Sequence, residues 1–215
     1  SIDEFWENIC HEKDCLERFE ATNDKKFDPN YVPVRGILSD IEYFDAAFFG
    51  LSPTDATITD PQHRIFLECA WNALEHAGIT PQKAQDKILS VFAGMTDSTY
   101  LQENLLKNNW YLSEHDHFHQ RISTSTGMLS TQLSYSLNLK GRSVNVNTAC
   151  STGLIAADQA CQDLVLGDSD VAIAGAVSII VPQQKGYYFK KGGIVSPNGT
   201  CTPFSSTSNG TVFSN

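Results

Sequence analysis

One stretch, residues 143–181, constrains the fold more than any other part of this chain. Its residue patterns predict, in order, a strand, a tight turn of small residues, a helix and a second strand: Ser143–Asn147, Thr148–Gly153, Leu154–Leu166 and Asp170–Val181. Such an order is a βαβ unit, in which the two strands are parallel and the crossover is right-handed. Parallel strands joined by a helix are typical of α/β proteins, so we expect an α/β fold.

The remaining patterns add helices and one more strand around this unit. We expect helices over 1–11, over Pro61–Ala77 and twice within 98–139, the second of these over Met128–Leu137, and a short buried strand over Ile88–Ala93. Asp60-Pro61 is a strong helix start, because Asp caps a helix and Pro suits its first position; Ser1 can cap the first helix. Residues 12–36 are polar and mixed, and are expected to be an irregular connection.

Composition and charge exclude several classes of protein. The 215 residues are 41% apolar and 19% charged, as in ordinary globular domains, and no apolar run is long enough to span a membrane. The net charge of −10 and the lack of a basic stripe argue against a nucleic-acid partner. No signal peptide is visible at the start of the sequence. The six cysteines form no C-x-x-C pair and are too sparse for a disulfide scaffold, so we expect a reducing, cytoplasmic compartment.

Cys150 lies in the predicted turn between the strand 143–147 and the helix 154–166. A sharp strand-to-helix turn presents one side chain above a sheet, and the small residues Ala149 and Ser151 allow the backbone to bend there. Backbone N–H groups at the start of a helix favour a thiolate and can hold an oxyanion, which suits acyl transfer. On this pattern alone the alternative, a small cysteine buried in a core, stays open.

The residues around Cys150 carry a family resemblance. From Val144 to Leu154 they resemble the active-site signature of β-ketoacyl synthases, in particular the ketosynthase domains of modular polyketide synthases. Other segments resemble the same family in the same order: Phe44–Pro53, Asp60–Glu75, Leu129–Tyr135 with Leu139–Gly141, and Gly192–Gly199 with Pro203-Phe204. The resemblance runs from Ser1 to Asn215, and several ordered motifs together favour a nucleophile over a core cysteine at position 150.

This resemblance implies a thiolase-like fold built from two similar halves. Cys150 would take an acyl chain from the phosphopantetheine arm of an acyl carrier protein. A malonyl-type extender on a second carrier would then lose carbon dioxide, and its carbanion would attack the Cys150 thioester in a Claisen condensation. No metal or redox cofactor is implied. The family is usually homodimeric, with the interface here expected around Asp170–Val181.

The sequence also departs from the family's pattern. The two catalytic histidines of the family lie downstream of its cysteine, and neither of their motifs occurs within residues 1–215; nor does the family's opening strand. We therefore expect 1–215 to be a partial ketosynthase domain, its N-terminal half, whose C-terminal half is a missing partner. Such a chain could be acylated on Cys150 but could not condense. Smaller departures are Arg142, where Pro is frequent, and Gly153, where Ser is frequent.

The histidines and the function of this chain allow other interpretations. His115, His117 and His119 would share a face if extended and could then bind a metal, although a solvated connection is the favoured interpretation. His63 and His76 are expected on the polar side or near the end of the helix that begins at Pro61. The functional alternatives are a non-elongating ketosynthase that only transfers acyl chains, a silent structural partner subunit, and a cysteine hydrolase. The sequence does not specify the acyl chain or the extender.

Overall fold

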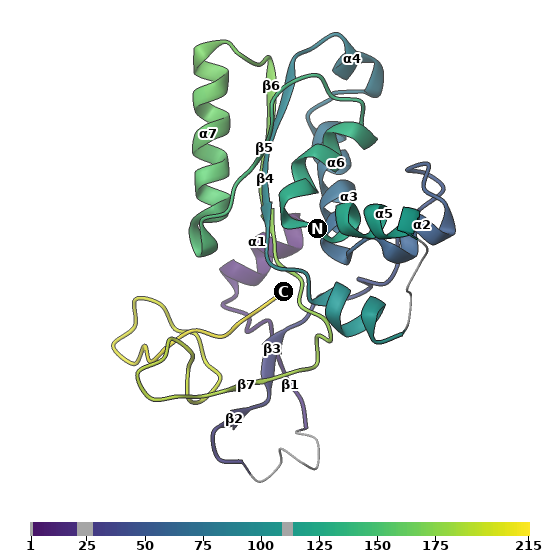
Figure 1. The fold of residues 1–215 in the computed structure, drawn as a ribbon. Helices are drawn as coiled ribbons and strands as arrows, with labels where there is room; N and C mark the ends of the chain where they lie inside the picture. The colour runs from purple at the N-terminus through teal and green to yellow at the C-terminus, as the bar shows by residue number, and fades with distance from the viewer. Residues whose placement is uncertain (1, 21–27, 109–113) are drawn as a thin grey trace. The chain divides into compact units, whose positions relative to one another are not determined.

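The computed structural model describes residues 2–20, 28–108 and 114–215, with the side chains of residues 114–116 left out (Figure 1). Its contacts divide the chain into two compact units. We call residues 40–180 the central unit, and residues 1–39 together with 181–215 the terminal unit. The residues that carry the family signature around Cys150 all lie in the central unit.

The central unit is built on a three-stranded parallel sheet in the order β5-β4-β6. Its strands are β4 (Leu89–Met95), β5 (Ser143–Asn145) and β6 (Val171–Val177). Val91 pairs with both Ser143 and Ile173, so β4 lies between the other two strands. The predicted parallel arrangement is confirmed. The two strands of the predicted βαβ unit are not neighbours, however, because β4 is inserted between them.

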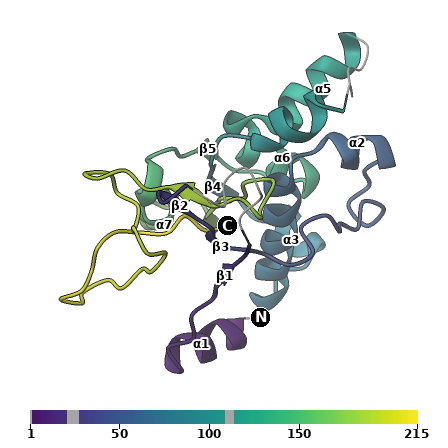
Figure 2. The ribbon, with the colours of Figure 1, turned by 90° about the horizontal axis from the view of Figure 1, so that it is seen from below.

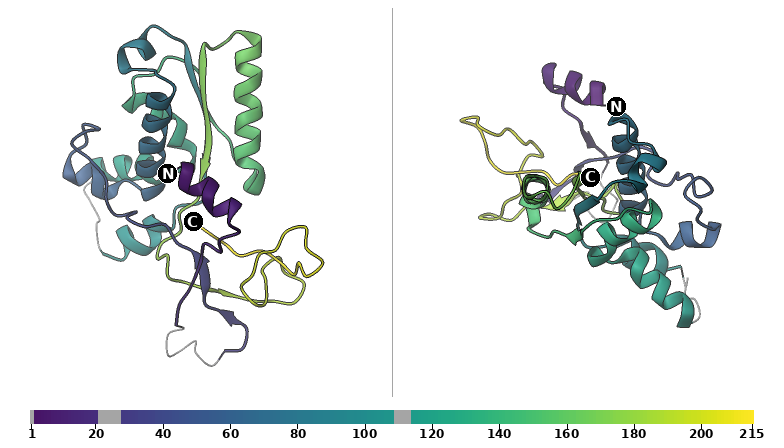
Figure 3. Two further views of the ribbon diagram at one scale, coloured as in Figure 1. Left: turned by 180° about the vertical axis from the view of Figure 1, so that it is seen from behind. Right: turned by 90° about the horizontal axis from the view of Figure 1, so that it is seen from above.

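Helices cover both faces of this sheet. Helix α7 (Thr152–Leu166) lies on one face, and α3 (Pro61–His76) and α6 (Leu129–Ser136) lie on the other. The views from below and from behind show the same layers (Figures 2 and 3). All seven residues of β4 are buried, as a strand covered on both faces requires. Its side chains alternate: Val91, Ala93 and Met95 pack with Phe66 and Leu129, whereas Phe92 packs with Ala156 and Ala160 of α7.

Helix α3 begins and ends where its sequence predicts. The Asp60 carboxylate accepts a hydrogen bond from the Gln62 N–H, and Pro61 occupies the first turn. At the other end Gly78 adopts a φ of 69°, and Ile79 N–H donates to Leu74 C=O at 2.8 Å, which closes the helix. The Trp71 ring lies nearly perpendicular to the rings of Phe48 and Phe49, so this helix packs against these residues as well as against the sheet.

Of the two helices predicted within 98–139, the second is confirmed as α6, whereas the segment between β4 and α6 holds more than the one helix predicted there. It holds a π-helix over Leu101–Leu106, α5 (Glu114–Thr124) and a 3₁₀ turn over Thr126–Met128 before α6. The expectation that His115, His117 and His119 lie in a connection between helices is wrong, because these residues belong to α5. The metal site was predicted for an extended segment, and that premise is wrong because the segment is helical. Among the described residues, no group of three His, Cys, Asp or Glu could hold a metal.

Two short helices complete the central unit. Helix α2 (Pro53–Ile58) is capped by the Ser52 hydroxyl, which accepts from the Asp55 N–H. Helix α4 (Pro81–Gln85) is capped in the same way by Thr80, which accepts from the Lys83 N–H. No helix of the described residues is long and apolar enough to cross a membrane.

The terminal unit contains α1 (Ile2–Cys10) and two antiparallel strand pairs. One pair is β1 (Leu16–Arg18) with β3 (Val34–Gly36), and the other is β2 (Tyr31–Val32) with β7 (Tyr187–Tyr188). The expectation of an irregular connection over 12–36 is therefore wrong for the strand residues, and 21–27 lie outside the described part. The predicted first helix is confirmed as α1, while its cap Ser1 is not described. The apolar face of α1, which includes Phe5 and Trp6, is exposed.

Candidate active site

Cys150 lies in a turn at the carboxyl edge of the parallel sheet. It is the middle residue of a 3₁₀ turn over Ala149–Ser151, which follows β5 and leads directly into α7. Cys150 is exposed, and no hydrogen bond joins it to a histidine in the described part of the chain. The predicted strand-to-helix turn is therefore present, and its thiol is open to a substrate.

The strand and the helix on either side of this turn are only partly buried. Strand β5 is exposed at Ser143 and partly buried at its other residues. Helix α7 buries only the side that faces the sheet, at Thr152, Ala156, Ala160 and Asp163. Its other side exposes large apolar residues, including Leu154, Val165 and Leu166. Helix α7 therefore has two apolar faces, and among the described residues only the face toward the sheet is covered.

Short polar side chains hold the backbone of the turn. Ala149 has a φ of 54°, in the left-handed region that residues with a Cβ rarely adopt. The Thr152 hydroxyl accepts from the Thr148 N–H at 3.0 Å and donates to the Ala149 C=O at 2.7 Å. The Ser151 hydroxyl donates to the Thr148 C=O at 2.8 Å. These bonds fix the strained backbone on both sides of Cys150, which is common where a backbone serves a function.

The first turn of α7 rests directly on two strands of the sheet. A Cβ added to Gly94 of β4 would lie closer than 3.0 Å to both Val146 O and the Thr152 side chain, a distance that real Cβ atoms essentially never show. Val146 N–H also donates to Ala93 C=O at 2.8 Å. On β6, the Ala176 Cβ lies 3.7 Å from where a Cβ of Gly153 would be. Gly94 was not singled out from the sequence, although a glycine inside a strand can signal a close backbone approach.

The start of α7 also provides the electrostatic environment of Cys150. Ser151 stands at the cap position but makes no side-chain cap hydrogen bond to the helix. The positive end of the helix dipole thus lies next to an exposed thiol, with no side-chain cap from Ser151 over it. Amides in this position can stabilise a thiolate or the oxyanion of a tetrahedral intermediate.

A polar network fixes the opposite end of α7. The Arg142 guanidinium contacts Asp163 of α7 and Asp168 just after it, each at 2.6 Å. Asp163 also accepts from the Ser169 hydroxyl, and this bond, followed by the hydrogen bonds and charges of its other neighbours, lowers the pKa of the carboxyl. Arg142 N–H donates to the Ser90 hydroxyl on β4. Arg142, noted in the sequence only as a departure from Pro, therefore ties α7 to the amino edge of the sheet.

His63 lies elsewhere than predicted. It is buried in the first turn of α3, on the sheet face opposite α7, and its Nε2 lies 3.2 Å from Ser125 O. The expectation that it lies on the polar side of the helix is wrong, because α6 and the residues before it cover this turn. Burial lowers the pKa of His63, so its imidazole is neutral at pH 7.

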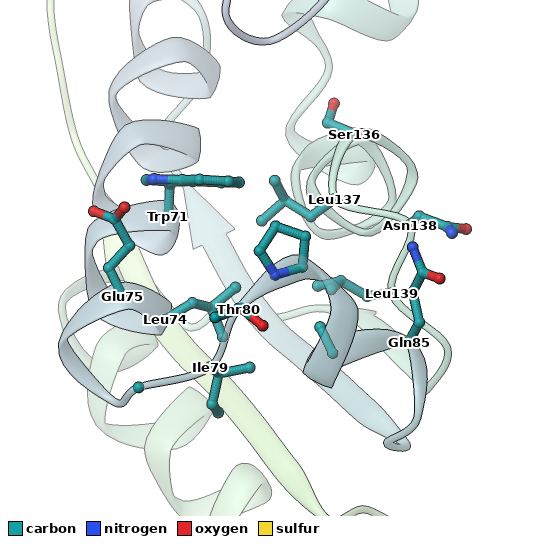
Figure 4. Close-up of a pocket in the computed structure, with 13 residues that line it drawn as sticks. Trp71, Leu74, Glu75, Ile79, Thr80, Gln85, Ser136, Leu137, Asn138 and Leu139 are labelled. Atoms are coloured by element: carbon teal, nitrogen blue, oxygen red, sulfur yellow. The ribbon is translucent and has the colours of Figure 1, made fainter.

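An apolar cavity of about 520 Å³ lies at the amino edge of the sheet, away from Cys150. It is formed between α3, α4 and the residues that follow α6, and Trp71, Leu74, Ile79, Leu137 and Leu139 point into it (Figure 4). These residues precede β4 and β5 in the chain, whereas Cys150 follows β5. The cavity is therefore not part of the cysteine site.

Comparison with known proteins gives this geometry a family. A family model described as "Beta-ketoacyl synthase, N-terminal domain" matches residues 1–215. A phenolphthiocerol/phthiocerol polyketide synthase of Mycobacterium tuberculosis is 38% identical, over 99% of this chain and 15% of its own length. Polyketide synthase PksM of Bacillus subtilis is 34% identical, over 99% of this chain and 5% of its own length. The chain thus spans a small fraction of these curated relatives.

Solved structures of similar proteins agree with the fold. Ketosynthase twelve of the bacillaene polyketide synthase of Bacillus amyloliquefaciens superposes with a TM-score of 0.86 at 26% identity, over 98% of this chain and 38% of that one. The ketosynthase of module 6 of the bacillaene synthase of Bacillus subtilis gives a TM-score of 0.80 at 30% identity, over 99% and 35%. The predicted thiolase-like α/β fold is confirmed by these similarities.

Proposed function

Because the chain belongs to the β-ketoacyl synthase family, as the N-terminal part of a polyketide synthase ketosynthase domain, we propose that Cys150 is its acyl-accepting nucleophile. The observation that carries this proposal is the exposed Cys150 thiol in the turn directly before α7. An exposed thiol beside the positive end of a helix combines access with stabilisation of the reactive anion.

The first step proposed is a thioester exchange. The Cys150 thiolate attacks the carbonyl carbon of an acyl thioester on the phosphopantetheine arm of an acyl carrier protein. The amides at the start of α7 stabilise the tetrahedral oxyanion. Collapse breaks the bond from the carbonyl carbon to the carrier's sulfur, and the released thiolate takes a proton from solvent. No atom changes its oxidation state in this exchange, so it requires no redox cofactor.

The second step, condensation, is proposed for the full-length enzyme. A malonyl-type extender on a carrier protein loses carbon dioxide, and the electron pair left on its carbon attacks the Cys150 thioester. The Cys150 thiolate departs, and the carrier holds a β-ketoacyl chain that is two backbone carbons longer. The catalytic histidines implied by the resemblance would come from a C-terminal half. We propose that the isolated chain takes acyl groups but does not condense them.

Two surfaces of the chain are suited to binding the partners that we propose. The exposed apolar side of α7, with Leu154, Val165 and Leu166, is suited to packing against a C-terminal half of the ketosynthase. Strand β6 is an edge of the described sheet, and it supports the proposal of a homodimer that pairs along this strand. The six free cysteines are consistent with the proposed cytoplasmic location.

A mass measurement tests the nucleophile. The chain is incubated with an acyl-pantetheine thioester, and intact mass is recorded for wild type, Cys150→Ala and Cys161→Ala; Cys161 is another exposed cysteine, on α7. We expect one acyl adduct in wild type and Cys161→Ala, and none in Cys150→Ala. An adduct that persists in Cys150→Ala would refute the assignment. A non-elongating ketosynthase would give the same adducts, but its complete domain would form no β-ketoacyl product with a malonyl carrier.

A further inference from the structure

The side chain of Gln62, in the first turn of α3, bridges the carboxyl ends of two strands. Its Nε2 donates to Thr96 O, one residue past β4, at 3.2 Å. Its Oε1 accepts from Ile179 N–H, two residues past β6, also at 3.2 Å. Gln62 is completely buried, and its own N–H is held by the Asp60 carboxylate at 2.8 Å. The amide orientation is unambiguous, because a backbone C=O requires a donor and a backbone N–H requires an acceptor.

This bridge occupies a specific place in the β4–β6 ladder. Met95 pairs with Val177, and Thr96 N–H donates to Val177 C=O at 3.3 Å. In a parallel ladder the next bond would join Ile179 N–H to Thr96 C=O. The Gln62 amide is inserted between these same two groups and satisfies both of them. It therefore replaces one rung of the ladder, holds the two strands further apart than a direct bond would, and ends the sheet at that point.

On both strands, the Gln62 amide lies within a few residues of the positions that contact the first turn of α7. On β4, Thr96 is two residues beyond Gly94, whose missing Cβ lets Val146 and Thr152 approach. On β6, Ile179 is three residues beyond Ala176, which faces Gly153. The first turn of α7 therefore rests on the two strands just before the point where Gln62 separates them.

We propose that Gln62 is a positioning residue for Cys150: by setting the separation of β4 and β6 beneath the first turn of α7, it fixes where that turn and the adjacent thiol lie. The geometry stands on its own, and only the consequence for acyl transfer rests on the proposed function. Neither strand end could be satisfied by its neighbour at this separation, so loss of the amide leaves buried backbone groups unpaired or lets the strands close.

The test compares two cysteines of one molecule. The full chain is treated with iodoacetamide, and peptide mass spectrometry gives the alkylation rates of Cys150 and of Cys161, which is exposed about three turns further along α7. Gln62→Met keeps the length of the side chain but removes both hydrogen bonds. We expect it to lower the Cys150/Cys161 rate ratio at least about fivefold, because the Cys150 sulfur then moves away from the positive end of α7, which is worth roughly that factor to a neighbouring negative charge. Gln82→Met, an exposed change on α4, is the control and leaves the ratio unchanged.

Gln62→Glu provides a readout that a merely structural role would not give. A carboxylate accepts from Ile179 N–H but repels Thr96 O, whereas a neutral carboxyl group can accept from one and donate to the other. We expect its rate ratio, taken relative to wild type at each pH, to be low at pH 8 and to recover toward wild type by about pH 5. Asp60, His63 and Arg64 are the titratable neighbours on or beside α3; they are present in all variants, and the wild-type ratio at each pH records their own titration.

The proposal is overturned by an unchanged ratio in Gln62→Met, or by the lack of recovery in Gln62→Glu. If these variants do not fold, hydrogen exchange of the wild-type chain decides: the Ile179 amide must be protected although it lies beyond β6, and fast exchange there refutes the bridge. Iodoacetamide requires no acyl transfer. A Gln62-dependent ratio in a chain that takes no acyl group from pantetheine would therefore retain this inference and reject the proposed function.

Discussion

Replacing Gly94 by Ala is the smallest change that should displace the cysteine turn. The added Cβ would meet Val146 O and the Thr152 side chain at less than 3.0 Å, and the Val146 carbonyl carbon at 3.2 Å. Backbone cannot move aside as the tip of a side chain can. Val146 is also held by its 2.8 Å bond to Ala93, next to Gly94 itself. Relief therefore requires β4 and the residues before α7 to separate.

Overpacking of this kind costs about 1–3 kcal/mol, and the rigid backbone partner places Gly94→Ala near the upper limit. The matched control is Gly153→Ala in the first turn of α7, whose new Cβ would lie at an ordinary 3.7 Å from Ala176. That change should be neutral or stabilising by up to about 1 kcal/mol, because Ala favours helix and restricts the unfolded chain. The free energy of unfolding in urea measures both variants.

The effects of the two glycine substitutions on stability should differ in sign as well as in size. We expect Gly94→Ala to lower the urea midpoint and the Cys150/Cys161 alkylation ratio together, while Gly153→Ala lowers neither. A Gly94→Ala variant within about 0.5 kcal/mol of wild type would refute the close approach of β4 to the turn.

Two further predictions concern charge. Burial lowers the pKa of His63 in the folded chain below 6.5, so below that pH the unfolded chain takes up a proton that the folded chain resists. The free energy of unfolding is therefore full above pH 6.5 and falls below it by up to about 1.4 kcal/mol per pH unit. In urea unfolding, His63→Gln should flatten this fall between pH 7 and about 5.5. Arg142→Met removes the guanidinium that contacts both Asp163 and Asp168. It should lower the urea midpoint more than Asp168→Asn does, because Asp168→Asn leaves the buried Asp163 paired with Arg142. Equal urea midpoints for the two variants would contradict the network.

Local signals in the sequence were enough to predict several elements. Asp60-Pro61 marks the start of α3 and Gly78 marks its end, because a helix cap and a left-handed glycine act within one turn of the chain. The small residues before α7 predicted the turn at Cys150, and the apolar run in residues 88–93 predicted a buried strand. These features depend on neighbours in the sequence, so no knowledge of the tertiary structure was needed.

Features that depend on distant pairing could not be obtained in this way. The position of β4 between β5 and β6 is set by contacts across the chain, which no local pattern encodes. The burial of His63 follows from helices that cover α3, and a polar residue type gives no sign of it. Gln62 is a common surface residue type, and its role emerges only when Thr96 and Ile179 are brought together.

Gln62 and Gly94 act on the same strand end, so their effects should be coupled. Gln62 holds Thr96 in place, and this prevents β4 from moving away when a Cβ is added at Gly94. Once Gln62→Met releases that end, β4 can yield, and Gly94→Ala should then cost at least about 0.5 kcal/mol less than it does in wild type. Arg142→Met acts at the opposite edge of the sheet, so its cost should add to that of Gly94→Ala within about 0.5 kcal/mol. Urea unfolding of both double-mutant cycles measures this, and equal additivity in the two cycles would show that the strand end is not held by Gln62.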